Sequence, residues 1–347
     1  MTAPRRIVVR APNWLGDAVM ALPAMAAVRD HFADAHLTVA AVPAVAAVFR
    51  EETDVRPDAV IDLPVESRGI TALLEGEAFD VGILLPNSWR SAWQLRRAGV
   101  PERWGYARSW RGPLLTRRVR RPRGGSVRHQ ADYYRHLVTS LGIACDPARA
   151  TRLAPRPSTM ERAGAMLVGA GVDPAATVVG LAPGAAYGEA KQWFPDRMAE
   201  VAARLVRDHH VTCVIVGASH DRAAAGAIES WLRAQAPDAL PRVVNLTGRT
   251  SLRTLVGVIA RTRAFVANDS GAMHLAAALG RPVTAVFGPT DERATRPIGD
   301  HHVLTASVFC RPCMLRDCPI DHRCMKRISV DAVYAAVADA LAHGAAR

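Results

Sequence analysis

Three polar segments each follow an apolar run, and their residue types suggest chemistry on a phosphorylated ligand. The first is Gly16-Asp17, which comes soon after the apolar residues 6–9. We expect Gly16 to adopt backbone angles that are closed to other residues. A single carboxylate in a partly dry site can act as a general base. The alternative is that Asp17 only begins a helix, where the helix dipole favours an acid.

The second segment is the glycine-rich loop PGAAYGEAKQW, residues 183–193. Backbone N–H groups around Gly184, Ala185 and Ala186 can hold phosphate oxygens. It is not a Walker loop, because it lacks the Gly-Lys-Ser/Thr ending. Lys191 is one of two lysines in a chain that otherwise uses arginine, which favours a role that needs a compact ammonium group. The alternative is a chance lysine on a solvated loop.

The third segment is NDSGAMH, residues 268–274. Asp269 or Ser270 is suited to cap a helix, and the small Gly271 leaves open a helix N-terminus that favours a phosphate. His274 lies one turn beyond Ser270, where a lone histidine is more often structural. Asp221 ends a further loop, which has the polar groups to hold a ribose or a base but is of ordinary loop composition.

Strands and helices must position these segments, and their alternation predicts parallel sheets with helices on both faces. Strands are predicted at 6–9, 37–42, 59–62 and 81–85, and again at 178–182, 211–216, 243–245, 264–267 and 283–287. Helices are predicted at 16–31, 195–208, 252–260, 270–279 and 329–342. A proline-rich break at 146–158 divides the chain into domains 1–155 and 156–328, with a last helix in 329–347. The fold class is therefore α/β, with two doubly wound domains and ligand sites beyond the carboxyl ends of the strands.

The positive charge is concentrated in one segment. Residues 88–135 contain thirteen arginines and two acids, a formal charge of +11 in a chain whose total is +12. Four of the seven tryptophans lie there as well. Such a surface attracts phosphates, polyanions or an anionic membrane, although a merely solvated arginine-rich face is the alternative. The sequence shows neither a signal peptide nor an apolar run long enough to span a bilayer, which predicts a soluble cytoplasmic protein.

Four cysteines lie close together near the end of the chain. Cys310 and Cys313 have metal-ligand spacing, and Cys318 and Cys324 follow them. The whole is not a standard zinc-finger pattern. A structural zinc or iron–sulfur site, reduced thiols and a disulfide all stay open, although a reducing compartment argues against a lasting disulfide.

Four stretches of the sequence together resemble the lipopolysaccharide heptosyltransferases of glycosyltransferase family 9. They are APNWLGDAVMALPAM (11–25), LLPNSWRSA (84–92), PGAAYGEAKQWFP (183–195) and NDSGAMHLAAALGRPVTAVFGPT (268–290). The second of them points to the heptosyltransferase II branch. The resemblance follows nearly the full chain in order. It implies the GT-B fold: two Rossmann-like domains facing across a cleft, with the acceptor bound by the first, the nucleotide sugar by the second, and the last helix packed back toward the first.

The resemblance also implies a reaction and a set of partners. An inverting transferase that needs no catalytic metal or other cofactor would move a heptose from ADP-heptose to the first heptose of the inner core, on lipid A that carries Kdo. The enzyme would work at the cytoplasmic face of the inner membrane, in peripheral contact with anionic lipid. The alternatives are a family 9 transferase with another sugar nucleotide or acceptor, and a nucleic-acid-binding protein that uses the arginine-rich surface; a nucleic-acid partner is not expected.

The roles of single residues follow from the resemblance. Asp17 would be the base, and Lys191 would stabilise the leaving group. The expected donor-binding residues are Gly184, Ala185, Ala186, Lys191, Asp221, Asp269, Ser270, Gly271 and His274. The expected acceptor-binding residues are Asn13, Trp14, Gly16, Asn87, Ser88, Arg117, Arg118 and Arg120. The family often has hydroxyl residues before the lysine, where this chain has Ala185 and Ala186, so diphosphate contacts there would depend on backbone N–H groups.

Overall fold

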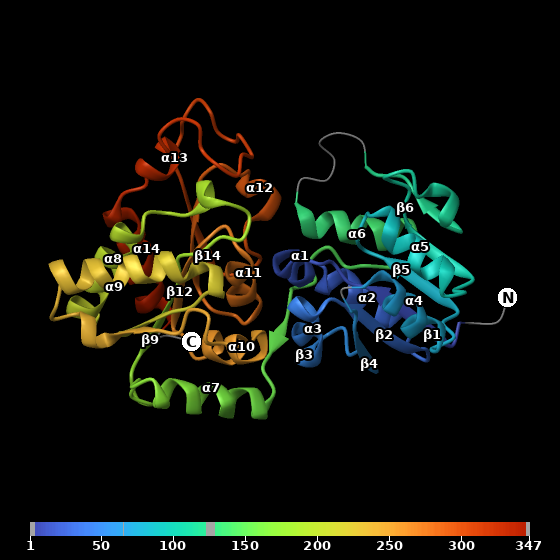
Figure 1. Cartoon of the computed structure of the whole chain (residues 1–347), viewed down its shortest axis with the longest axis horizontal. Coiled ribbons are helices and arrows are strands. Elements are labelled where there is room, and N and C mark those ends of the chain that lie inside the picture. The colour runs from blue at the N-terminus through green and yellow to red at the C-terminus, as the bar shows by residue number, and fades with distance from the viewer. Residues whose placement is uncertain (1–3, 65, 123–128, 345–347) are drawn as a thin grey trace. The chain divides into compact units, whose positions relative to one another are not determined.

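The computed structural model describes residues 4–64, 66–122 and 129–344. Arg123 and Arg128 of the arginine-rich segment, and the last three residues of 329–347, lie outside the described residues. The chain divides into two compact units, Met1–Ala154 and Pro155–Arg347. Each unit contains its own sheet (Figure 1) and its own hydrophobic core.

The first unit is built on a six-stranded parallel sheet with the order β4-β2-β1-β5-β6-β7. Its strands are β1 (Arg6–Arg10), β2 (His36–Ala41), β4 (Ala59–Asp62), β5 (Val81–Leu84), β6 (Glu102–Tyr106) and β7 (Arg117–Val119). Its helices are α1 (Leu15–Met20), α2 (Leu22–His31), α3 (Pro43–Arg50), α4 (Ser67–Glu75), α5 (Trp89–Arg97) and α6 (Gln130–Ser140), with a 3₁₀ turn η1 (Gly112–Leu114). A separate antiparallel pair joins β3 (Glu52–Thr53) to β8 (Leu153–Ala154).

Two features of this unit differ from the sequence prediction. The predicted helix 16–31 is two helices, because Pro23 in the first turn of α2 lacks an N–H and its ring obstructs a continuous helix. Strands β6 and β7 were not predicted, since the arginines in ERWGY and RRV mask the alternation. Pairing with β5 buries Trp104 and Tyr106 in β6 nevertheless.

The second unit repeats the architecture with the order β11-β10-β9-β12-β13-β14. Its strands are β9 (Val178–Ala182), β10 (Thr212–Ile215), β11 (Val243–Asn245), β12 (Ala264–Asn268), β13 (Val283–Phe287) and β14 (His301–Thr305). The main helices are α7 (Pro157–Gly169), α8 (Pro195–His209), α9 (Arg222–Gln235), α10 (Leu252–Ala260), α11 (Gly271–Ala278) and α14 (Val330–Gly344). Shorter turns are η2 (Glu189–Lys191), η3 (Ser219–Asp221), η4 (Leu240–Arg242), α12 (Glu292–Thr295) and α13 (Arg323–Lys326).

Helix α14 packs within the second unit. It contacts α8, β12, β13 and β14, and its Val333 and Val337 are fully buried in that core (Figure 1). Its apolar stripe is covered by the sheet of its own unit, which removes that apolar surface from water. The packing of this helix toward the first domain, which the resemblance implies, stays a prediction.

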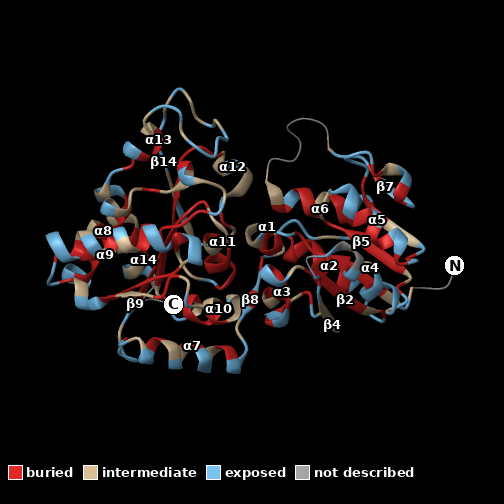
Figure 2. Ribbon diagram, viewed as in Figure 1, coloured by how far each residue is buried: buried red, intermediate tan, exposed pale blue. Residues whose placement is uncertain are grey.

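Burial follows the sheets in both units. Figure 2 shows buried residues along the strands and on the inner sides of the helices, with exposed residues on the outer sides. Strands that are buried on both faces are apolar throughout, as in β9 (VVGLA) and β13 (VTAVF). No helix among the described residues combines the length and apolarity needed to cross a bilayer.

Candidate functional site

Several of the predicted site residues follow the strands between which the strand order of each sheet reverses. In the first unit this switch point is between β1 and β5, and in the second it is between β9 and β12. The segments of Asp17 and Asn87 follow β1 and β5, while those of Lys191 and Asp269 follow β9 and β12. Ligands of open α/β sheets bind in the crevice outside the strand ends at such a point.

In the first unit, Asp17 is held by a tyrosine that was not predicted as a site residue. Asp17 lies in the first turn of α1, half-buried, and its Oδ1 accepts a 3.0 Å hydrogen bond from the hydroxyl of Tyr134 in α6. Burial, together with the negative charge of Asp17, raises the pKa of Tyr134 well above its ordinary value, so its hydroxyl keeps the proton that it donates. The carboxylate is therefore fixed in orientation, as a general base must be.

The loop between β1 and α1 is shaped by a buried arginine. The guanidinium of Arg10 donates to the carbonyl of Ala11 at 2.6 Å and to Oδ1 of Asn13 at 2.8 Å. Burial lowers the pKa of Arg10 to about 10. Asn13 and Trp14 are exposed, with Trp14 at 60%. Gly16 lies inside α1 with helical geometry, so the expectation of special backbone angles was wrong; a helix N-terminus needs none.

The segment after β5 is tied down by a second buried arginine. Arg111 is fully buried and donates to the carbonyls of Tyr106 and Pro86, and more weakly to Oδ1 of Asn87 at 3.4 Å. Asn87 in turn donates to the hydroxyl of Tyr133 at 3.0 Å. Ser88 is the N-cap of α5, where its hydroxyl accepts from a backbone N–H at 3.2 Å. Its side chain therefore has a structural role, whereas Asn87 lies at the switch point.

The three predicted acceptor arginines do not form one cluster. Strand alternation sends Arg117 and Arg118 to opposite faces of β7. The guanidinium of Arg117 lies 4.6 Å from the centre of the Trp104 ring, while Arg118 donates weakly to a backbone carbonyl. Arg120 follows the carboxyl end of β7 and is exposed. Of the three, only Arg120 follows the carboxyl end of its strand, and Asp17 likewise follows the carboxyl end of β1.

In the second unit, Lys191 and Asp269 form a buried ion pair. The Nζ of Lys191 lies 2.6 Å from Oδ2 of Asp269, and their side chains are only 12% and 5% exposed. Thr290 donates to the same oxygen at 2.7 Å, and Lys191 lies over the ring of Tyr187, 4.7 Å from its centre. The sequence predicted both ends of this pair but not the pairing. Asp269 is thus an anchor for the ammonium group as well as a candidate for sugar hydroxyls.

Asn268 fixes both ends of the lysine loop, which we define as residues 183–193. Its Nδ2 donates to the carbonyl of Pro183 at 2.6 Å, and its Oδ1 accepts from the N–H of Trp193 at 3.0 Å. Asn268 and Trp193 are both fully buried. Asn268 was not among the predicted site residues. A buried amide directly before the predicted Asp269 is the signal that would have found it.

The start of α11 has a hydroxyl group that no described residue satisfies. Ser270 is the N-cap residue, but its side chain forms no cap, and its buried Oγ has no hydrogen-bond partner among the described residues. Gly271 begins the helix, and His274 within it is buried. In the lysine loop, Gly184 and Ala185 are buried and Ala186 is exposed. The N–H groups of α11 and the hydroxyl of Ser270 provide hydrogen-bond donors for an anion.

Asp221 lies inside the fold rather than on an open loop. It is 6% exposed, and its Oδ2 accepts from the N–H of Ala218 at 2.8 Å. Gly184 and Gly217 pack on this carboxylate, and a Cβ at Gly184 would stand 2.0 Å from its Oδ1. Asp221 therefore holds the loops after β9 and β10 together, which gives it a structural role next to the predicted phosphate site.

All six cysteines are free thiols in the structure. Burial raises the pKa of Cys324, and the thiols of Cys310, Cys318 and Cys313 raise it further. The N–H of His322 donates to the Sγ of Cys318 at 3.3 Å. Across residues 4–64, 66–122 and 129–344, no three His, Cys, Asp or Glu side chains are arranged to hold a metal ion.

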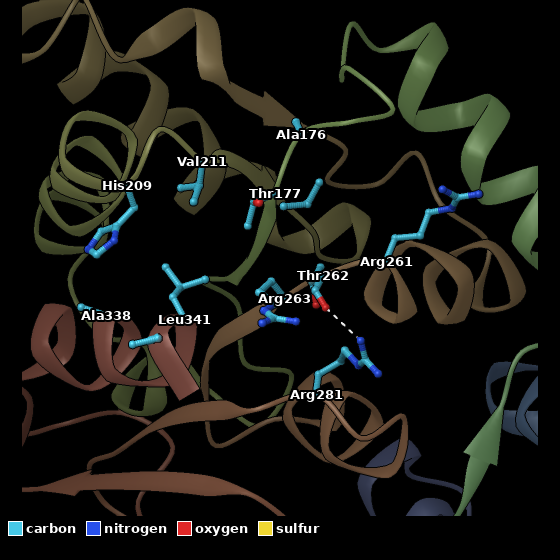
Figure 3. A pocket seen from close by; sticks show the side chains of 12 residues that line it. Ala176, Thr177, His209, Val211, Arg261, Thr262, Arg263, Arg281, Ala338 and Leu341 are labelled. Atoms are coloured by element: carbon cyan, nitrogen blue, oxygen red, sulfur yellow. Dashed lines mark hydrogen bonds between the residues drawn. The ribbon is translucent and has the colours of Figure 1, made fainter. Parts of the chain in front are cut away.

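A pocket of about 520 Å³ lies at the amino edge of the second sheet, opposite the carboxyl edge that carries Lys191 and Asp269. It is lined by residues next to the amino ends of β9 and β12, together with part of α14, and its charged members include Arg261, Arg263 and Arg281 (Figure 3). Arg281 donates to the backbone carbonyl of Thr262 at 3.4 Å. None of the predicted site residues lines this pocket, so we place the candidate site at the carboxyl edge instead.

Comparison with known proteins identifies the family. The model of "Glycosyltransferase family 9 (heptosyltransferase)" matches residues 69–323, well over half of the chain. The chain belongs to glycosyltransferase family 9. It is accordingly an enzyme of glycosyl transfer, and the lysine loop and the start of α11 lie within the matched residues.

Curated relatives of this family 9 chain are heptosyltransferases. It is 26% identical over 333 residues to the lipooligosaccharide heptosyltransferase 2 of Campylobacter jejuni, covering 94% of this chain and 96% of the relative. It is 29% identical over 314 residues to the lipopolysaccharide heptosyltransferase 2 of Escherichia coli, covering 84% and 85%. These matches to heptosyltransferases 2 cover most of the chain, and they support the heptosyltransferase II branch that residues 84–92 suggested.

Solved structures show the fold. The structure of E. coli ADP-heptose lps heptosyltransferase II matches with a TM-score of 0.84 at 24% identity, covering 97% of this chain and 99% of that one. E. coli heptosyltransferase WaaC with ADP matches with a TM-score of 0.71 at 19% identity, covering 96% and 99%. The fold is therefore GT-B, with two Rossmann-like units, as the resemblance implied.

Proposed function

We propose that this family 9 enzyme transfers a heptose from ADP-heptose to the first heptose of the lipopolysaccharide inner core, as a heptosyltransferase II. The observation that carries the proposal is the buried Lys191–Asp269 pair beside the uncapped start of α11, at the switch point of the second sheet. A nucleoside diphosphate suits this place, because it brings negative charge to an ammonium group and a helix N-terminus. The names of the curated relatives and the ADP in the WaaC structure support the same substrates.

The reaction that we propose is a direct, inverting displacement without a catalytic metal. Asp17 accepts the proton of the acceptor hydroxyl, whose oxygen forms a bond to the anomeric carbon of the heptose. The bond from that carbon to the diphosphate oxygen breaks, and ADP leaves with the bonding electrons. Lys191 and the N–H groups of α11 stabilise the charge that develops on the leaving oxygen. Tyr134 keeps Asp17 in position for the proton transfer.

We also propose that the first unit meets its lipid-linked acceptor at the cytoplasmic face of an anionic inner membrane. Support comes from exposed aromatic residues at the ends of adjacent strands: Trp14 after β1, Trp89 and Trp93 after β5, and Trp110 after β6, with Trp110 at 96% exposure. Trp89 and Trp93 stack at 5.1 Å. Exposed arginines accompany them in α5, at Arg90, Arg96 and Arg97. Tryptophan favours the water–lipid interface, and arginine favours lipid phosphate.

The test is ADP release from ADP-heptose, with and without deep-rough lipopolysaccharide that carries a single heptose. We expect release that depends on this acceptor. Lipopolysaccharide that lacks the heptose, and other sugar nucleotides, serve as matched controls for acceptor and donor. Equal release with the heptose-free acceptor would show that the proposed acceptor is wrong. Release only with a different sugar nucleotide would show that the chain is a family 9 transferase with another donor.

A further inference from the structure

The cysteine-bearing segment, residues 310–318, packs directly on the lysine loop. The carbonyl of Arg316 accepts from the N–H of Ala190 at 2.9 Å, and the hydroxyl of Tyr187 donates to the carbonyl of Met314 at 2.8 Å. A Cβ at Gly188 would stand 2.5 Å from the Arg316 carbonyl oxygen, so glycine is required there. The position of this segment is therefore fixed relative to the loop that carries Lys191.

The same segment is also tied to the loop after β13. The N–H of Met314 donates to the carbonyl of Pro289 at 2.9 Å. Arg311 donates to the carbonyls of Gly288 at 2.7 Å and Thr290 at 3.1 Å. Because Thr290 holds Asp269, the segment spans the two loops on either side of the Lys191–Asp269 pair. It is thus a part of the wall of the proposed donor site.

Arg316 brings a second cation to this site. Its guanidinium carbon lies 5.1 Å from the centre of the Tyr187 ring, and the Nζ of Lys191 lies 4.7 Å from the same centre. Tyr187 thus holds both cations beside one ring. Arg316 is exposed and forms no ion pair with any described residue. By contrast, Arg311 is paired with Glu292, and Arg323 is paired with Asp321.

A second cation would balance the charge of a diphosphate bound at this site. A diphosphate leaving group carries more than one negative charge, whereas Lys191 supplies a single positive charge that it shares with Asp269 at 2.6 Å. Ala185 and Ala186 offer no hydroxyl groups to the phosphates. An arginine without an acidic partner can bind phosphate oxygens with two parallel hydrogen bonds.

We propose that Arg316 binds the diphosphate of the nucleotide-sugar donor, and that Tyr187 positions its guanidinium group beside Lys191. This inference rests on the proposed function, since it takes a nucleoside diphosphate as the ligand of the second unit. It also explains why the cysteine-bearing segment packs on the lysine loop, because the segment carries a donor-binding residue into the site.

Calorimetric titration of the full-length protein with ADP tests the proposal. We expect Arg316→Gln to weaken ADP binding about tenfold, the size of a lost charged phosphate contact. Arg316→Lys should lose less, because it keeps the charge and loses only the paired geometry. Arg327→Gln is the matched control, an exposed arginine in the same part of the chain, and its ADP affinity should stay within about twofold of the parent. The thermal midpoint of each variant confirms that it folds.

Titration with adenosine separates a phosphate contact from a change in loop shape. We expect adenosine to bind Arg316→Gln and the parent equally. An equal loss for adenosine and ADP would overturn the proposal, as would an ADP affinity of Arg316→Gln within about twofold of the parent. If the parent does not bind ADP, the proposed donor is wrong and the inference fails with it. If the parent binds ADP but transfers no heptose, the reaction is wrong, while the titrations still decide the role of Arg316.

Discussion

At the scale of single residues, each of the two charged groups of the proposed chemistry is held by a residue of its own unit. Asp17 is half-buried and accepts a hydrogen bond from the hydroxyl of Tyr134, which orients the carboxylate. Lys191 is paired with an acid, so its ammonium group is fixed while its charge is balanced. A general base must be able to accept a proton, and a side chain that stabilises a leaving group must be held rigidly. The arrangements of Asp17 and Lys191 therefore suit their proposed roles.

Asp17→Asn should lower kcat by about 10²–10⁴-fold, because the amide keeps the shape of the side chain but cannot accept the proton. Initial rates of ADP release at saturating donor and acceptor measure this effect. Asp34→Asn removes an exposed acid of the same unit and should leave kcat unchanged. A rate for Asp17→Asn within about threefold of the parent would show that another group is the base.

The buried Tyr134 should make stability fall at high pH. Burial and Asp17 raise the pKa of Tyr134 above its ordinary 10.0, so the folded state retains a proton that the unfolded state loses. Its contribution is therefore complete below about pH 10 and is lost as the pH rises through the folded pKa. We expect the free energy of unfolding, measured with urea, to fall less between about pH 9 and about pH 11 in Tyr134→Phe than in the parent. Equal slopes would contradict this account.

At the scale of secondary-structure elements, strand ends determine where the polar groups go. The last residue of β12 is Asn268, which ties the lysine loop at both ends, and the next residue is Asp269, which binds Lys191. One strand end therefore sets both the path of the loop and the position of its cation. The irregular segment 310–318 completes the site through hydrogen bonds to backbone groups of two loops.

Asn268→Ala should disturb the lysine loop as a whole. It leaves the buried N–H of Trp193 and the carbonyl of Pro183 without their partner, which costs about 1–3 kcal/mol for each buried group left unsatisfied. We expect a lower free energy of unfolding and weaker ADP binding together. Asn245→Ala, at the end of β11, removes an amide that accepts from the N–H of Thr247 and should lower stability without weakening ADP binding. The same ADP affinity in both variants would contradict the role of Asn268.

At the scale of the whole molecule, charge and aromatic surface are unevenly distributed. The arginine-rich segment and the four exposed tryptophans all belong to the first unit, whereas the buried ion pair of the site belongs to the second. Among the described residues of the first unit, the ion pairs involve none of the exposed arginines from Arg90 to Arg121. Their charge is therefore available to an anionic surface or acceptor.

Replacing Arg117, Arg118, Arg120 and Arg121 by Gln should weaken binding to anionic vesicles by about tenfold or more, since each basic residue near such a surface contributes about 1 kcal/mol. Sedimentation with vesicles at about 50 and about 200 mM salt measures this, and the salt dependence should shrink as well. The matched control replaces four exposed arginines of the second unit: Arg162, Arg233, Arg249 and Arg261. Equal losses in both sets would show that only net charge matters, and no loss in either would show that these faces are merely solvated.

The local features of this protein could be predicted from its sequence alone. Apolar runs such as VVGLA and VTAVF predict buried parallel strands, because both faces of such strands must be apolar. The placement of Asp17, Lys191 and Asp269 after such runs was enough to predict polar groups at strand ends, since the carboxyl ends of parallel strands share an edge. Strands β6 and β7 were missed, because arginine-rich segments lack the alternation that predicts a strand.

The contacts between distant residues, by contrast, became known only from the packed fold. Tyr134 reaches Asp17 across 117 positions of sequence, and Lys191 reaches Asp269 across 78. Sequence spacing contains no information on such contacts, because they depend on strand order and helix packing. The same holds for Arg316, whose place beside Tyr187 follows from backbone hydrogen bonds of an irregular segment. The contacts of α14 with β12, β13 and β14 could not be predicted either, because an apolar stripe can pack on any apolar surface.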